Sequence, residues 1–199
     1  MNEIYEQIKT LARREGIFRS KDLKALGIPR VYLSRMAERG MLERVARGLY
    51  RLPDTAVTEH HSLVEAGMRV PHGVICLLSA LAFHRLTTQL PFEVWIAIEN
   101  KAWAAKEDRL HIRFVRFSGE AFTAGIEYQT IEGIPVKIYS PAKTVADCFK
   151  YRNKIGLDVA LEALRDGLRK RLFTVDNLWH YADICRVQNV IRPYLEATL

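Results

Sequence analysis

The chain of 199 residues is 49% hydrophobic and 27% charged, and its formal net charge is +7. This composition is typical of a globular protein, and it excludes a disordered, collagen-like or disulfide-stabilised chain. The longest nearly unbroken apolar run, residues 74–83, is too short for a membrane span. Glu3, Glu6 and Glu15 lie within the first twenty residues, which is unlike a secretory signal peptide. We therefore expect a soluble, cytoplasmic protein with no membrane partner.

Nearly all of the positive charge excess lies in the first quarter of the chain. Residues 1–52 contain twelve Lys and Arg residues against six Asp and Glu residues, whereas the remainder is almost neutral. A local excess of this kind indicates a polyanionic partner such as nucleic acid. A solvated basic face without a partner is the alternative explanation, because charge alone is weak evidence.

Three short helices are predicted in this first quarter. Ile4, Ile8 and Leu11 repeat with helical spacing and form one apolar stripe, which ends before Gly16. A second helix is predicted over residues 21–26 and a third over residues 29–39. Glycines follow both, and proline suits the first position of the third helix.

Two short β-prone runs follow the third helix. Residues 41–45 and 49–52 flank Arg47 and a glycine, which indicates a hairpin with Arg47 at its tip. Three helices followed by a basic hairpin predict a winged helix-turn-helix. Such a fold binds DNA in many proteins, but a winged helix that only contacts other proteins remains an alternative, because fold does not dictate function.

The third helix supplies the candidate DNA-reading surface. A helical wheel places Leu33 and Met36 on one side and polar residues opposite. We expect the opposite side to face the major groove, the phosphates to be held by flanking cations, and the wing tip to contact the minor groove or the adjacent backbone. The expected groove residues are Arg30, Val31, Ser34 and Arg35, the expected phosphate contacts are Lys21, Arg39 and Arg44, and the wing-tip residue is Arg47.

The remaining three quarters predict an α+β domain. We expect a helix over residues 59–70 and a buried helix over residues 74–86, which is apolar on nearly every face. Strands are predicted over residues 92–98 and 111–117, and a hairpin over residues 126–139 turns at Glu132-Gly133. Four strands connected in this way indicate a small mixed or antiparallel sheet.

A helical region closes the chain. Ser140-Pro141 is typical of a capped helix start, and Ala142, Val145, Ala146 and Phe149 then mark its inward stripe. Further helices are predicted over residues 157–169, after a Thr174 cap, and over residues 187–195. The fold class is therefore α+β, with a winged helix-turn-helix DNA-binding domain at residues 1–53 and an α+β domain at residues 57–199.

Catalytic motifs are weak throughout. Glu99-Asn100-Lys101 after a strand has the form of a Mg²⁺-dependent, restriction-like nuclease element, but its upstream acid is unclear, because Glu93 is a poor candidate and Asp108 and Asp147 follow the motif. Asp147 is more simply explained as an acid on the buried face of its helix. There is no phosphate-binding loop or nucleophile elbow, and the three cysteines are isolated. We predict no catalytic residue, no metal site and no cofactor, while the nuclease stays an alternative.

Four segments resemble the AbiEi antitoxin family, and the resemblance covers nearly the whole chain. They are Gly27-Ile28-Pro29-Arg30-Val31-Tyr32-Leu33-Ser34-Arg35, residues 40–50 (Gly-Met-Leu-Glu-Arg-Val-Ala-Arg-Gly-Leu-Tyr), residues 78–86 (Leu-Ser-Ala-Leu-Ala-Phe-His-Arg-Leu) and residues 140–147 (Ser-Pro-Ala-Lys-Thr-Val-Ala-Asp). The resemblance departs from the family pattern at Lys143, where the family more often carries arginine.

The resemblance implies a bacterial transcriptional autorepressor of a type IV toxin–antitoxin, or abortive infection, operon. Such proteins bind repeats in promoter DNA through the winged helix. Their second domain counters a nucleotidyltransferase toxin, typically without a stable complex with it. We accordingly expect double-stranded DNA as the direct partner, the toxin as a functional partner, and a monomer or weak dimer that cooperates on DNA.

Overall fold

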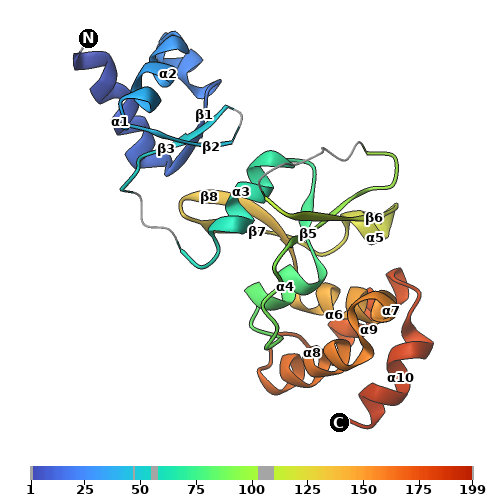
Figure 1. The fold of residues 1–199 in the computed structure, drawn as a ribbon. Helices are drawn as coiled ribbons and strands as arrows, with labels where there is room; N and C mark the ends of the chain where they lie inside the picture. The colour runs from blue at the N-terminus through green and yellow to red at the C-terminus, as the bar shows by residue number, and fades with distance from the viewer. Residues whose placement is uncertain (1, 47, 55–57, 103–109, 199) are drawn as a thin grey trace. The chain divides into compact units, whose positions relative to one another are not determined.

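The computed structural model describes residues 2–46, 48–54, 58–102 and 110–198. The chain forms two compact units (Figure 1). The first comprises Met1–Arg69 and Gln129–Pro135, and the second comprises Val70–Tyr128 and Val136–Leu199. The fold is α+β, as predicted, with helices at the beginning and the end of the chain and sheets between them. The domain boundary expected at residues 53–57 stays a prediction.

The first unit contains a winged helix-turn-helix, as predicted. Its elements are α1 (Asn2–Glu15), β1 (Ile17–Arg19), the 3-10 helix η1 (Asp22–Leu26), α2 (Val31–Glu38), β2 (Glu43–Ala46), β3 (Leu49–Arg51) and α3 (His61–Arg69). The three strands form one antiparallel sheet in the order β1-β3-β2. The second predicted helix is thus a 3-10 helix. The third begins at Val31 and not at Pro29, because the amides of Tyr32 and Leu33 bond in a tight first turn to the carbonyls of Pro29 and Arg30.

One apolar core holds these elements together. Ile8 and Leu11 of α1 are buried against Leu23 of η1 and Leu33 and Met36 of α2. The stripe predicted on α1 is therefore its packing face. Burying a side chain of this size contributes about 1.5–3 kcal/mol of hydrophobic free energy, so this core fixes which face of α2 remains exposed.

The second sheet has five strands in the order β6-β5-β4-β8-β7. They are β4 (Val74–Ile75), β5 (Val94–Glu99), β6 (Ile112–Phe117), β7 (Ile126–Ile131) and β8 (Ile134–Tyr139). β4 pairs antiparallel with β5 and parallel with β8, while β5 and β6 are parallel, so the sheet is mixed. The predicted strands and the hairpin are confirmed.

The helix predicted over residues 74–86 is wrong at its start. Val74 and Ile75 form the central strand β4, and Cys76 has extended backbone angles, so α4 covers only Leu77–Phe83. A continuous apolar run is compatible with either a buried strand or a buried helix, and periodicity does not distinguish them. This run forms first the buried strand β4 and then the buried helix α4.

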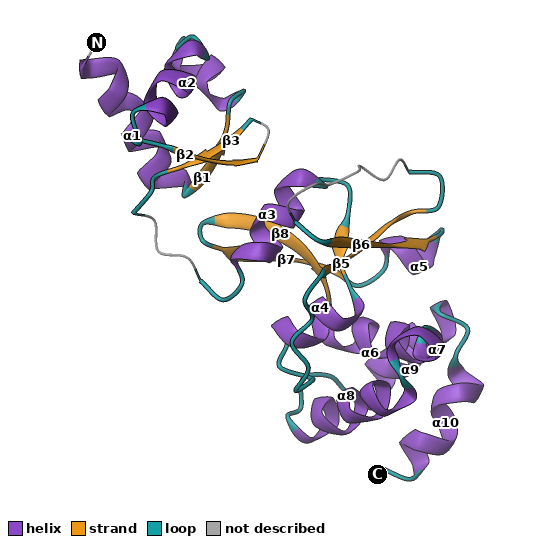
Figure 2. Cartoon of the chain, in the orientation of Figure 1, coloured by secondary structure: helices purple, strands orange, loops and turns teal. Residues whose placement is uncertain are grey.

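Helices gather on one side of the five-stranded sheet (Figure 2). They include α6 (Pro141–Lys150), α7 (Arg152–Ile155), α8 (Leu157–Arg169), α9 (Val175–Ile184) and α10 (Gln188–Glu196), while the short α5 is Glu120–Thr123. α6 is central and packs against α4, α8 and α9. The predicted caps are confirmed: the Ser140 hydroxyl accepts from the Lys143 amide, and Thr174 forms a capping box with Asn177. None of the helices in the described part of the chain combines the length and apolar character needed to cross a bilayer.

Candidate nucleic-acid interface

The face of α2 opposite the core is exposed over its whole length. Leu33 and Met36 are buried, whereas Arg30, Val31, Ser34 and Arg35 are all exposed. Val31 is 49% exposed, although it is apolar, which leaves its methyl groups available to a partner. A guanidinium, a hydroxyl and a small apolar group on one helix face are the groups that distinguish base edges in the major groove.

The turn before α2 sets the exposure of this face. Gly27 ends η1 in the left-handed conformation at φ +67°, and its amide bonds back to the carbonyl of Lys24. Glycine adopts this conformation without the strain that a side chain would bring. The chain therefore reverses within residues 27–30, and α2 starts directly from the turn with Arg30 at its N-terminal end.

Two arginines, one in α2 and one at its C-terminal cap, lie over tyrosine rings. The guanidinium carbon of Arg35 is 5.7 Å from the centre of the Tyr32 ring. Arg39 is at the same distance from the ring of Tyr5 on α1, and it also donates a hydrogen bond of 3.2 Å to the Tyr5 hydroxyl. Both arginines remain exposed. Arg35 is thus steadied within its own helix, whereas Arg39 is held toward α1, which reduces its freedom to reach a phosphate.

The cations near the start of α2 are more accessible. Within the described part of the chain, the side chains of Lys21 and Arg30 make no hydrogen bond or ion pair, and both are exposed. A hollow of about 360 Å³ lies beside Arg30, and it is lined by Ser20, Lys24, Gly27, Ile28, Pro29 and Arg30. Lys24 was not among the predicted site residues, and its position beside Arg30 makes it a further candidate for a phosphate contact.

The hairpin β2–β3 forms the wing. Arg44 is exposed on β2, next to a bulge in the pairing between Arg44 and Ala46. The carbonyl of Gly48 accepts a hydrogen bond of 2.8 Å from the amide of Ser20, which ties the wing to the segment after β1. Arg47, predicted at the wing tip, lies outside the described residues.

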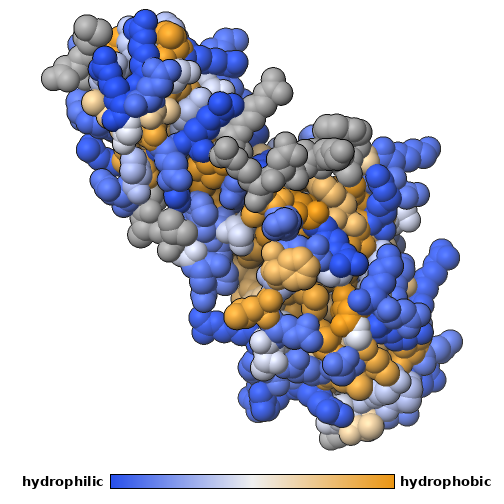
Figure 3. Space-filling model, viewed as in Figure 1, coloured by the Kyte–Doolittle hydropathy of each residue, from blue (hydrophilic) through white to orange (hydrophobic). Residues whose placement is uncertain are grey.

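Other basic residues of the first quarter are held in hydrogen bonds and ion pairs within the first unit. The Arg51 guanidinium bonds Glu43 at 2.7 Å across the hairpin and lies 3.3 Å from Nε2 of His61. Arg19 donates to the carbonyl of Met68. The charge excess of residues 1–52 is therefore divided between an exposed set around α2 and a set held in contacts within the unit. The space-filling view shows hydrophilic residues over much of the visible face of α1 and α2 (Figure 3).

Glu132 completes a polar network that the sequence did not reveal. Its carboxylate accepts from the amide and hydroxyl of Thr58 at 2.8 and 2.9 Å, and it lies 2.7 Å from Nδ1 of His61. Arginine is only a donor, so Nε2 of His61 must accept from Arg51 while Nδ1–H donates to Glu132. Burial raises the pKa of Glu132, but the hydrogen bonds from Thr58 and His61 outweigh it and lower the pKa below its usual value.

The residues of the nuclease alternative lie in different surroundings. Glu99 and Lys101 are both exposed, and no group of three or more His, Cys, Asp or Glu side chains in the described ranges is arranged to hold a metal ion. Asp108 lies outside the described residues. Asp147 is fully buried in α6, as its sequence position indicated, and there it bonds Lys143 at 2.6 Å.

The Lys143–Asp147 pair is enclosed by the core of the second unit. The Lys143 ammonium lies 4.2 Å from the ring centre of Tyr139 and 4.9 Å from that of Phe117. The Cys185 thiol donates to the other Asp147 oxygen at 3.2 Å. Complete burial raises the pKa of Asp147, and the Lys143 charge opposes that rise. Both side chains are buried, so the pair is part of the core of the second unit.

Comparison with known proteins identifies a family for a segment of the first unit. Residues 6–53 match the model of the family described as "Transcriptional regulator, AbiEi antitoxin", so the resemblance is confirmed over that segment. No curated protein matches the chain. Among solved structures, the chain is similar to the RV2827C protein from Mycobacterium tuberculosis, with a TM-score of 0.66 and 12% sequence identity. That similarity covers 97% of this chain and 76% of the other, and it shows a shared fold.

Proposed function

We propose that the chain, whose residues 6–53 match the AbiEi family of transcriptional regulators, is a sequence-specific repressor of its own promoter and the antitoxin of a type IV system. The observation that carries the proposal is the exposed polar face of α2 opposite a fully buried apolar face. A helix presented in this way fits the major groove of duplex DNA. The surrounding cations would neutralise phosphates on either side.

In this proposal the contacts divide into two classes. Arg30, Val31, Ser34 and Arg35 contact base edges, and they determine which sequence is bound. The cations Lys21, Arg39 and Arg44 hold phosphates, and Arg47 of the wing contacts the minor groove or the adjacent backbone. The domain division at residues 53–57 separates this DNA-binding part from an antitoxin-type domain.

Fluorescence anisotropy with a labelled fragment from upstream of the gene tests the DNA-binding part. Arg35→Ala should cost about 1–3 kcal/mol of binding free energy if Arg35 contacts a guanine, and it should reduce the preference over a scrambled fragment. Arg186→Ala, which removes an exposed arginine from the second unit, is the matched control. If both variants bind the promoter as the wild type does, α2 is not the recognition helix.

The antitoxin part is tested separately in cells. We expect the gene beside this one to encode a nucleotidyltransferase, and we expect co-expression of the full chain to relieve its toxicity. Because the proposal assigns neutralisation to the second domain, the Arg35→Ala variant should still relieve toxicity while losing repression. A purified toxin that remains attached to the chain after DNA is removed would indicate a stable protein complex in place of the expected indirect one. Sedimentation with and without the promoter fragment tests the expected monomer or weak dimer.

A further inference from the structure

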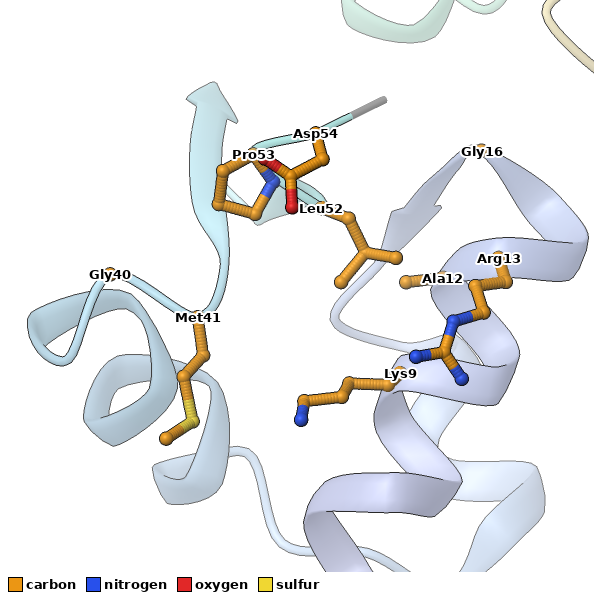
Figure 4. Close-up of a pocket in the computed structure, with 9 residues that line it drawn as sticks. All are labelled: Lys9, Ala12, Arg13, Gly16, Gly40, Met41, Leu52, Pro53 and Asp54. Carbon is orange, nitrogen blue, oxygen red and sulfur yellow. The ribbon is translucent and has the colours of Figure 1, made fainter. Parts of the chain in front are cut away.

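The winged-helix unit contains a second, larger hollow of about 600 Å³. Its walls come from α1, from the turn after α2 and from the residues that follow β3 (Figure 4). Hollows of this size hold small organic ligands in many proteins. None of the expected DNA contacts lines it, so the hollow is distinct from the proposed DNA-binding face.

Part of the lining of the hollow is apolar. Ala12 of α1 is buried, and Met41 and Leu52 are half-buried. Figure 4 shows the Leu52 side chain extending from the opposite wall toward α1. Water in contact with such side chains is displaced favourably by an apolar ligand, so this part of the lining suits the hydrocarbon body of a small molecule.

Two cations reach into the same hollow from α1. Lys9 and Arg13 are four residues apart and therefore lie on one face of the helix, and both side chains extend into the hollow in Figure 4. Lys9 is paired with Glu6 at 3.0 Å, whereas Arg13 makes no hydrogen bond or ion pair among the described residues. Like charges at this spacing repel each other, and an anion placed between them would relieve that repulsion.

The opposite rim carries the reverse charge. Asp54 lines the hollow from the segment after β3, across from α1. A bound carboxylate is therefore repelled from that rim and attracted to the α1 side. A planar guanidinium and a carboxylate also match in geometry, which favours this anion at Arg13.

We propose that this hollow binds a small apolar molecule carrying one carboxylate, with the carboxylate against Lys9 and Arg13 and the apolar body against Met41 and Leu52. These contacts agree on the orientation: Lys9 and Arg13 lie on α1, Asp54 lies across from α1, and Met41 and Leu52 supply apolar surface. Binding requires only the chain and the dissolved ligand, and neither DNA nor a protein partner is needed.

Methionine methyl NMR tests this site, because the Met41 side chain lines the hollow and its methyl signal reports on binding. The chain has four methionines, and ¹³C-methyl labelling of the full chain gives each its own signal, with Met41 assigned from Met41→Leu. Met36, which is fully buried in the core, is an internal control. The probes are 4-phenylbutyrate, 4-phenylbutyramide and 4-phenylbutylamine, which share one apolar body and differ in charge. The carboxylate should shift Met41 saturably, the amide more weakly, and the amine least.

Matched variants separate the charge contribution from simple apolar contact. Arg13→Gln should weaken binding of the carboxylate roughly three- to tenfold, as expected for loss of one exposed charge-assisted contact. Arg14→Gln is the control, because Arg14 bonds Glu15 at 2.8 Å and does not line the hollow. Asp54→Asn should leave binding unchanged or tighten it. An unshifted Met36 signal in each variant shows that its fold is intact.

Three results would overturn the proposal. One is equal affinity for the carboxylate and the amine, which would indicate apolar contact alone. Another is the same affinity in Arg13→Gln as in Arg14→Gln. The third is the absence of a saturable Met41 shift up to about 10 mM of 4-phenylbutyrate, since a ligand of this size held by these contacts should bind within that range.

Discussion

Replacing one partner of the Lys143–Asp147 pair tests how this buried charge network supports the second unit. Lys143 is 0% and Asp147 1% exposed, and their charged atoms are 2.6 Å apart. Asp147→Asn keeps the shape of the side chain but removes its charge, which leaves the Lys143 ammonium buried without an anion. Breaking a buried pair from one side typically costs about 3–5 kcal/mol of unfolding free energy.

The two single substitutions should differ in their pH dependence. In Lys143→Met, Asp147 loses its counter-ion, but a carboxyl group can take up a proton, and burial already raises its pKa. A raised folded-state pKa favours the protonated form, so the cost of Lys143→Met should grow as pH rises through that pKa and shrink in acid. In Asp147→Asn, the remaining charge is an ammonium, and acid gives no relief.

Urea unfolding followed by circular dichroism measures these free energies, and the double variant Lys143→Met/Asp147→Leu completes the cycle. We expect the double variant to be close to the wild type or more stable by about 1–4 kcal/mol, because hydrophobic residues of similar volume avoid the desolvation cost of the pair. Additive single effects, with a coupling energy below about 0.5 kcal/mol, would refute the view that the two charges depend on each other.

Three further predictions concern the first unit. Lys21→Ala should weaken binding to all duplexes about equally and reduce the slope of log K against log salt by about 0.9, measured by anisotropy titrations at several salt concentrations; an unchanged slope would exclude a phosphate contact. Gly16→Ala should destabilise the chain by more than Gly27→Ala in urea unfolding: both glycines have positive φ, but a Cβ on Gly16 would lie 2.5 Å from the Glu132 carbonyl oxygen, whereas one on Gly27 meets nothing within 4 Å. Glu132 has a folded-state pKa below its ordinary value of 4.5, so its carboxylate stabilises the fold above that pH and this contribution is lost as pH falls through the folded-state pKa. Glu132→Gln should therefore lower stability at pH 7 and flatten the acid side of the stability profile, and an unaltered profile would contradict this.

Local signals were sufficient to predict the winged helix. Apolar spacing defined α1 and the packing face of α2, and Gly16, Gly27 and Gly40 marked where elements end. These features act over a few residues, so the sequence displays them directly. The predicted start of α2 was two residues too early. Proline followed by arginine is typical of a helix start, but Pro29 and Arg30 instead form a tight turn before the helix.

The central strand β4 was missed for a different reason. Its two residues are part of an apolar run that continues into α4, and they become a strand only because β5 and β8 lie on either side to pair with them. Pairing partners far away in the chain decide the structure of such a segment, and a local pattern cannot report them.

The polar contacts of the first unit also differ in whether the sequence could predict them. Contacts within one hairpin were predictable, whereas contacts between distant segments were not. Register alone could have paired Glu43 with Arg51, because the predicted hairpin places them opposite each other. No local signal connects His61 with Glu132, which is 71 residues away. Since Arg51 is held by Glu43 and lies against His61, it contributes to the net charge without adding a cation to the exposed surface. A count of basic residues therefore overestimates the charge available to a polyanion. The exposed side chains of α2, which combine charge with groups able to contact base edges, are the features that favour DNA as the partner.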